Sequence, residues 1–276
     1  MTPNLNNLGT YANTTHNGTA VILSDTNLSG TYTSRIFDAT SAANWNNFSL
    51  TKQNSNITYL FAADLTGSVY SSNNSGVNWT LINSSYGRTT DGQGMFSDSN
   101  NNLYIISNTN KEVWKSTNSG ISWSVVNKTF SSNNLFAGTS DTNGNLFVAA
   151  GTTTGIIFKS TDSGLTWLTV NSTLSLGNSA TTKGMTSNSS NALFLVSGGG
   201  YVYSSINSGI SWTLVNSSYG RTTGAVGMFS DSNNNIYIIT DTKKEVWRSN
   251  NSGVTWNIVN ETFSSANLLA GNGDAN

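Results

Sequence analysis

Residues 115–123 read KSTNSGISW, and close copies of this stretch recur along the chain. The copies are SSNNSGVNW at 71–79, KSTDSGLTW at 159–167, SSINSGISW at 204–212 and RSNNSGVTW at 248–256. Their last residues are spaced by 44, 44, 45 and 44 positions, at Trp79, Trp123, Trp167, Trp212 and Trp256. A degenerate copy, FDATSAANW, ends at Trp45, 34 residues before Trp79. A fixed period of about 20–50 residues indicates a repeat architecture.

Each full unit has the composition of a small antiparallel sheet. Runs such as NLYIIS (102–107) and KEVWKS (111–116) are rich in β-branched and aromatic residues. Asn, Asp, Gly and Ser fill the gaps between them, as expected of tight turns. No segment shows a convincing helical period. Four strands in about 44 residues, repeated around a circle, predict a β-propeller.

The recurring turn has a physical logic. Its Ser, and the Asn or Asp two residues later, can bond neighbouring backbone N–H groups. Gly allows a positive φ at low cost, and the Trp can fold back over the hairpin. The second polar position is Asp162 in one copy and Asn in the other four, so the turn requires an acceptor and not a charge.

These residues resemble the Asp-box, or bacterial neuraminidase repeat, S-x-D-x-G-x-x-W. The resemblance covers the chain from about residue 30 and implies a propeller, the fold of the sialidases, xyloglucan-cleaving glycosidases, sortilin-type receptors and photosystem assembly factors of that family. It carries little about function, because enzymes and non-enzymes share the repeat. The structural positions of the five boxes are Ser72, Asn74, Gly76, Trp79; Ser116, Asn118, Gly120, Trp123; Ser160, Asp162, Gly164, Trp167; Ser205, Asn207, Gly209, Trp212; and Ser249, Asn251, Gly253, Trp256.

A longer duplication suggests how the ring closes. Residues 79–143 match residues 212–276 at 45 of 65 positions, with an offset of three units. We therefore expect an all-β, six-bladed propeller over residues 17–276, one blade per tryptophan from Trp45 onward, preceded by an arm at 1–16. The segment Phe263–Gly271 is expected to complete the first blade beside residues 19–24, 31–37 and 44–50, so that N- and C-terminal strands close the ring and leave no open edge. The alternative is that the chain is a fragment of a longer array, with a different domain at its N-terminus.

Composition excludes several classes of function. Charged residues are 9% of the chain and the formal net charge is -1, which argues against nucleic-acid binding. No stretch approaches the length of a transmembrane helix, and the N-terminus has no signal-peptide pattern. Cysteine is absent, and the single His16 has no metal-ligand partner in sequence, so no metal or other cofactor is expected. A surface rich in amides and hydroxyls favours an extracellular, cell-surface or virion-surface location.

No catalytic set is recognisable. The family's sialidases use three arginines, a Tyr–Glu nucleophile pair and an Asp acid, whereas this chain has Arg35, Arg88, Arg221 and Arg248, and only Arg88 and Arg221 are placed for a ligand. Glycosidases need two carboxylates about 5–10 Å apart. Asp98 and Asp231 are expected on opposite blades, in SDSNNN segments typical of plain turns, and Asp91 lies in a preceding loop.

Two further patterns are candidate surface sites. The segment YGRTT occurs at Tyr86–Thr90 and Tyr219–Thr223, between the last strand of one unit and the first of the next. Tyr86, Arg88, Tyr219 and Arg221 are therefore candidate ligand-binding residues at the tunnel mouth, with Arg supplying bidentate bonds and Tyr stacking. Five glycosylation sequons stand four residues after a box tryptophan, at Asn83, Asn127, Asn171, Asn216 and Asn260. A turn-forming Asn at the end of the fourth strand explains them equally well.

The sequence thus favours a non-enzymatic extracellular structural or binding propeller, such as a surface-layer, sheath, filament or virion component. Protein partners or self-assembly are expected, without nucleic acid or membrane insertion. The alternatives are a glycan-binding glycoprotein module that uses the tunnel mouth and a glycoside hydrolase resembling sialidases or xyloglucanases.

Overall fold

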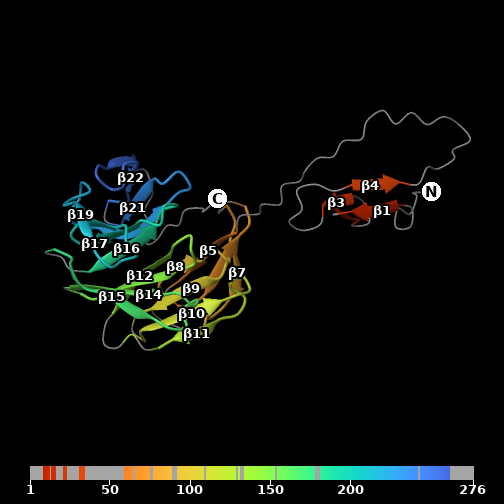
Figure 1. The fold of residues 1–276 in the computed structure, drawn as a ribbon, viewed down its shortest axis with the longest axis horizontal. Coiled ribbons are helices and arrows are strands. Elements are labelled where there is room, and N and C mark those ends of the chain that lie inside the picture. The colour runs from red at the N-terminus through yellow and green to blue at the C-terminus, as the bar shows by residue number, and fades with distance from the viewer. Residues whose placement is uncertain are drawn as a thin grey trace, which may run out of the picture. The chain divides into compact units, whose positions relative to one another are not determined.

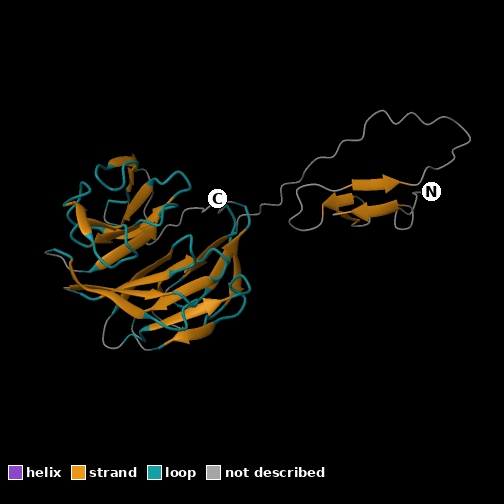
Figure 2. Ribbon diagram, in the orientation of Figure 1, coloured by secondary structure: helices purple, strands orange, loops and turns teal. Residues whose placement is uncertain are grey.

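A computed structural model describes strands within residues 9–34, and residues 59–261 apart from 65, 75–76, 89–91, 109, 129, 131–133, 153, 178–180 and 242. The chain divides into two compact units, Met1–Asn54 and Ser55–Asn276. Every regular element among the described residues is a strand (Figure 2). None of these residues forms a helix long and apolar enough to cross a membrane.

The first unit contains two short antiparallel pairs. Strand β1 (Gly9–Ala12) pairs with β4 (Thr31–Ser34), and β2 (Thr14–His16) pairs with β3 (Val21–Leu23). The sequence predicts a propeller that starts at residue 17, whereas the division between the units falls after Asn54.

The second unit is a β-propeller whose blades follow one another along the chain (Figure 1). The first blade shows β5 (Leu60–Ala63), β6 (Val69–Ser72) and β7 (Thr80–Asn83). The second is formed by β8 (Gly92–Ser97), β9 (Leu103–Ser107), β10 (Glu112–Ser116) and β11 (Ser124–Asn127). The third is formed by β12 (Leu135–Ser140), β13 (Leu146–Ala150), β14 (Thr154–Ser160) and β15 (Leu168–Ser175).

The fourth blade comprises β16 (Thr182–Ser187), β17 (Leu193–Ser197), β18 (Val202–Ser205) and β19 (Thr213–Asn216). The fifth comprises β20 (Ala225–Ser230), β21 (Ile236–Thr240), β22 (Val246–Ser249) and β23 (Asn257–Asn260). All pairings are antiparallel meanders, and the first strands of successive blades touch, β8 with β12, β12 with β16 and β16 with β20.

The prediction of six blades is wrong. The described structure has five blades, and the described strands of residues 9–34 form two-stranded sheets in the separate first unit. The degenerate copy at 37–45 explains the error in part, because it carries Ala42 where the described boxes carry Gly with φ of +80° to +90°. A Cβ disfavours that conformation. The expected closing strand, Phe263–Gly271, and Trp45 lie outside the described residues.

The core lies between the blades, because the second strands of the second, third and fourth blades, β9, β13 and β17, are buried along their whole length. In β13, Leu146, Val148 and Ala150 pack toward the second blade, while Phe147 and Ala149 pack toward the fourth. All five residues of this strand are fully buried. The continuous apolar runs in the sequence are therefore second strands, and the blade junctions are where the fold is stabilised.

The repeated turns between third and fourth strands share one hydrogen-bond pattern. In the second blade, Ser116 Oγ accepts the Gly120 N–H at 2.9 Å and donates to Asn118 Oδ1 at 3.0 Å. Asn118 Oδ1 also accepts the Ser122 N–H, and Trp123 Nε1 donates to the Gly120 carbonyl at 2.9 Å. The third, fourth and fifth blades repeat these contacts. Gly76 of the first blade lies outside the described residues.

Candidate functional site

The two YGR segments form part of a contact between blades. Each lies in the loop that leaves the fourth strand of one blade, and its arginine reaches a glutamate at the start of the third strand of the next blade. Arg88 donates to Glu112 through Nε at 2.9 Å and Nη2 at 2.6 Å. Arg221 makes the same two-pronged contact with Glu245. We call each set of Tyr, Gly, Arg, Glu and Trp residues a clasp: 86–88 with 112 and 114, and 219–221 with 245 and 247.

The tryptophan of each clasp packs on the glycine. A Cβ at Gly87 would lie 2.3 Å from the Trp114 ring, and one at Gly220 would lie 2.4 Å from the Trp247 ring. The indole N–H of Trp247 donates to Glu245 at 2.8 Å. The arginine guanidinium stands over the same indole, with 5.7 Å and 5.8 Å to the ring centroids in the two clasps. These contacts fix the arginine and its carboxylate in one geometry.

The tyrosines of the clasps are buried. Tyr86 and Tyr219 are 1% exposed and meet the tryptophans of the next blade edge to face. Burial raises the pKa of Tyr219 above its ordinary value. The ring faces are therefore not available to stack on a ligand, and the predicted stacking role of the tyrosines is replaced by a packing role. The same position, seven residues after the box tryptophan, holds Phe130 and Leu174 in other units, which was a signal that it belongs to the core.

Charge in the clasps is balanced locally. Burial alone would raise the pKa of Glu112, but hydrogen bonds from Arg88 and Trp114 lower it below its usual value. The hydrogen bond from Arg221 lowers the pKa of Glu245, against the effect of burial. Neither glutamate is predicted as a site residue from the sequence, because each stands 24 positions from its arginine. The available signal was that YGR and KEVW occur together in the same two units.

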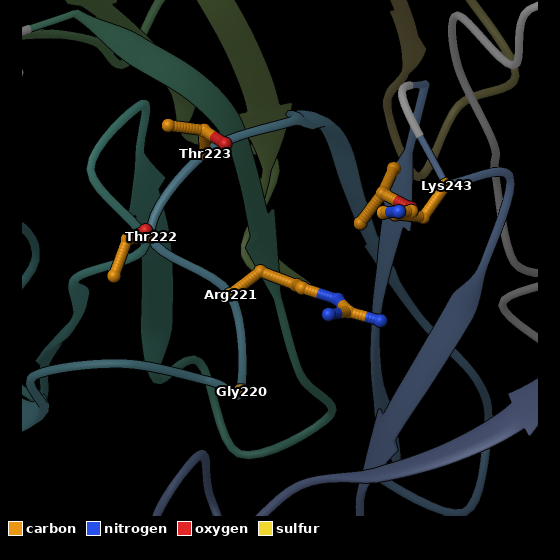
Figure 3. Close-up of a pocket in the computed structure, with 6 residues that line it drawn as sticks. Gly220, Arg221, Thr222, Thr223 and Lys243 are labelled. Carbon is orange, nitrogen blue, oxygen red and sulfur yellow. The ribbon is translucent and has the colours of Figure 1, made fainter.

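A small cleft lies beside the second clasp. It has a volume of about 290 Å³ and is lined by Gly220, Arg221, Thr222, Thr223, Thr240 and Lys243. Figure 3 shows Arg221 extending from its loop toward the hairpin that carries Lys243. Its charged lining residues are Lys243 and Arg221, the latter paired with Glu245, and it is the place where Arg221 could meet a ligand. Thr89, Thr90 and Asp91, which follow Arg88 in the first copy, lie outside the described residues.

The acidic residues singled out as glycosidase candidates form turns. Asp98 Oδ1 accepts the N–H groups of Asn100 and Asn102 at 2.9 Å, and its Oδ2 accepts the Tyr104 hydroxyl at 2.9 Å. Asp231 repeats these contacts in the fifth blade, and hydrogen bonds from Asn235 lower its pKa, against the effect of burial. In the described part of the chain, no group of three His, Asp or Glu side chains could hold a metal ion.

The sequon asparagines also make structural contacts. Asn83 Nδ2 donates to the Ile121 carbonyl in the next blade at 2.8 Å, and Asn171 and Asn216 do the same toward Ile210 and Val254. Their Oδ1 atoms accept a backbone N–H two residues later. Asn127 is buried. These inter-blade bonds account for the placement of three of the five sequon asparagines, and glycosylation stays a prediction.

Two of the candidates, His16 and Arg35, lie near the N-terminus, where no side chain is among the described parts of the structure. The structure gives the backbone of His16 within β2, whereas Arg35 lies outside the described residues. Arg248 lies on β22, directly before the turn of its box.

Comparison with known proteins places the chain in a family. Residues 4–259 match the model of the DUF6242 beta propeller domain, and the chain belongs to this family. No curated protein sequence matches it.

Solved propellers share the fold at low identity. A chain of the nidogen/laminin complex has a TM-score of 0.62 and 14% identity over 78% of this chain and 80% of its own. The protein YCF48 bound to a D1 peptide has a TM-score of 0.50 and 14% identity, over 71% of this chain and 61% of its own. An ancestral GH74 enzyme has a TM-score of 0.53 and 19% identity, over 76% of this chain and 30% of its own. Enzymes and binding proteins both appear, so the likeness defines the fold alone.

Proposed function

We propose that this chain is a non-enzymatic binding propeller, working at an extracellular, cell or virion surface as part of a layer, sheath, filament or particle, and that its partners are proteins or further copies of itself. The observation that carries the proposal is the use made of its acidic side chains. Carboxylates are the groups a glycosidase would need, and seven of the thirteen acidic side chains of this chain are engaged in contacts that stabilise the fold. The residues so engaged are Asp64, Asp98, Asp141, Asp162 and Asp231 in turns, and Glu112 and Glu245 in the clasps.

Protein binding suits the fold and the surface. The solved neighbours include a propeller in a nidogen/laminin complex and one bound to a peptide. The repeated turn supports a distant kinship with the Asp-box proteins, which would account for the enzyme among those neighbours. The surface has few charges to be screened by salt, as expected of a protein outside the cell.

A hydrolysis screen tests the absence of catalysis. The purified chain is incubated with aryl glycosides, a sialoside and xyloglucan oligosaccharides, and we expect no turnover above a buffer blank. Turnover that is lost in Asp98→Asn or Asp231→Asn, with the melting temperature unchanged, would overturn the proposal. An unrelated propeller prepared in the same way controls for contaminating enzymes.

Glycan binding is a second candidate, favoured by the cleft beside Arg221. The cleft brings together Arg221, Lys243 and three threonines, a set suited to an acidic sugar. A glycan array with sialylated and uronic-acid probes tests it. The candidate stands if an acidic probe binds and Lys243→Ala weakens that binding; it fails if none binds or the substitution has no effect.

A further inference from the structure

A larger groove lies between the third and fourth blades, away from both clasps. Its volume is about 600 Å³, and strands β15, β18 and β19 supply much of its lining. Three aromatic side chains contribute to it, Tyr201, Tyr203 and Trp212. The repeat pattern of the sequence predicts no role for Tyr201 or Tyr203.

The groove coincides with the loss of the clasp at this junction. Leu174 stands where the clasps have Tyr, Leu176 stands where they have Arg, and Tyr201 stands where they have Glu. The tyrosine, the tryptophan and the partly exposed ion pair of the clasps are thus replaced by two leucines and two tyrosines, with Tyr203 in the place of the tryptophan. At the junction of the second and third blades, which also lacks the clasp, Phe130 packs on Phe158. At the junction of the third and fourth blades, the groove lies beside the substituted residues Leu174, Tyr201 and Tyr203.

The replacement leaves aromatic surface at the groove. Gly177 lies against the ring of Tyr201, so closely that a Cβ would come within 2.6 Å of it. Tyr203 is almost fully buried beneath, while Ile210 of the adjoining turn is 60% exposed. Asn171 bridges the junction by donating to the Ile210 carbonyl at 2.9 Å. Contacts from both blades therefore define the shape of the groove.

The lining has a consistent chemistry. None of the described residues that line it carries a charge. Its polar groups are hydroxyls and an amide, from Thr173, Ser175, Ser211 and Asn171. Aromatic faces with a few polar groups are typical of small-molecule sites. A charged ligand would find no counter-ion in this lining, whereas a neutral polyol could pack its C–H face on a ring and exchange hydrogen bonds with the hydroxyls.

We infer that this groove binds a neutral saccharide, through the ring of Tyr201 and the hydroxyls and amide around it. The inference goes beyond the proposed function, because it assigns a ligand class and a site that protein partnership does not require. Its failure would leave the absence of catalysis untouched, since the hydrolysis screen tests that separately.

The test uses a panel of neutral oligosaccharides built from glucose, galactose, mannose and N-acetylglucosamine, first on an array and then by calorimetric titration of the best probe.

The first variant, Leu174→Tyr/Leu176→Arg/Tyr201→Glu, introduces the Tyr, Arg and Glu side chains of the clasps and should fill the groove. The second, Ile210→Ser, alters an exposed side chain at its rim. We expect the triple variant to weaken binding about tenfold or more and Ile210→Ser to weaken it measurably. Ile121→Ser, at the equivalent exposed position of the second blade, is the matched control and should bind as the native chain does.

Three outcomes would overturn the inference. The first is that no neutral oligosaccharide binds. The second is that both variants bind the saccharide with the affinity of the native chain, which would place the saccharide elsewhere. The third is that an uncharged apolar peptide panel binds in a manner abolished by Ile210→Ser while the saccharides do not, which would make the groove a peptide site. If the triple variant fails to fold, the saccharide affinities of Ile210→Ser and Ile121→Ser still decide whether the groove is the binding site.

Discussion

At the scale of single residues, each repeated turn needs a side-chain oxygen that accepts a backbone N–H. In the second to fifth blades, the same side chain also makes a second hydrogen bond, to a hydroxyl four residues later. Asp162 Oδ1 accepts the Thr166 N–H at 2.9 Å, and its Oδ2 accepts the Thr166 hydroxyl at 2.5 Å. Asn251 makes the same backbone contact but donates its amide to the Thr255 hydroxyl at 2.7 Å. Because a hydroxyl rotates to donate or accept, both residues satisfy the turn.

Asp162→Asn should therefore change the free energy of unfolding by about 0.5 kcal/mol or less at pH 7. Asp162→Ala removes the acceptor and should cost about 1–2 kcal/mol. Urea unfolding of the two variants beside the native chain checks both values. A loss above about 1 kcal/mol in the Asn variant would show that the charge itself is needed, contrary to the four sister turns.

The two clasp glutamates should make stability depend on acid pH. Each has a pKa lowered in the fold from an ordinary value of 4.5. A lowered pKa contributes stability that is present above the unfolded pKa and is lost as pH falls through the folded pKa. The double variant Glu112→Gln/Glu245→Gln should thus melt lower than the native chain at pH 7, and the gap should close as the pH falls from 4.5 through the lowered pKa values of the folded state. Melting curves across that range measure it; a gap that is constant with pH would contradict a charge effect.

At the scale of elements, the glycines of the clasps decide how closely one blade approaches the next. Gly220 has φ of +118° and the Trp247 ring against its Cα. Gly220→Ala should therefore cost about 1–3 kcal/mol, from backbone strain and from displacement of the indole. The measurement is the free energy of unfolding.

Gly94→Ala is the control for that prediction. Gly94 lies in β8, and the nearest atom to an added Cβ would be a carbonyl oxygen at 3.9 Å. We expect it to change stability by about 0.5 kcal/mol or less. Equal losses in the two variants would show that the contact with Trp247 is unimportant.

Much of the local structure could be predicted from sequence. The strands and the turns recur with the period because they depend on residues a few positions apart, such as Ser116 with Gly120. The clasps could not be predicted with equal ease, because Arg88 and Glu112 meet only once two blades have packed. Tyr86 was placed at the surface because its loop position was considered without the apolar residues at the same position of other units.

At the scale of the whole molecule, the number of blades depended on one degenerate unit. The duplication of 79–143 suggests two halves of three blades. A duplication shows that two segments are related, but it does not determine how many blades close the ring. The strands described before residue 35 pair with one another in two two-stranded sheets. A spacing of 34 where the others are 44 or 45 was the signal that this segment differs.

The propeller unit should be stable without the first unit. A chain that begins at Ser55 retains the second compact unit, so its melting temperature should agree with that of the full chain within about 2 °C, which corresponds to less than about 1 kcal/mol at this size. Calorimetry of both chains measures the difference. A large drop, or aggregation of the shorter chain, would show that residues 1–54 complete the fold.

The paired clasps also have an evolutionary consequence. Because the loop after the first blade and the loop after the fourth present the same coupling to the blade that follows, unequal exchange between the two gene segments would still join a compatible loop to a compatible blade. Such a chain can change its length by three units without inventing a new junction. The second and third junctions, which have no clasp residues in the sequence, are then positions where the lineage is free to vary the surface while the clasped junctions keep their geometry.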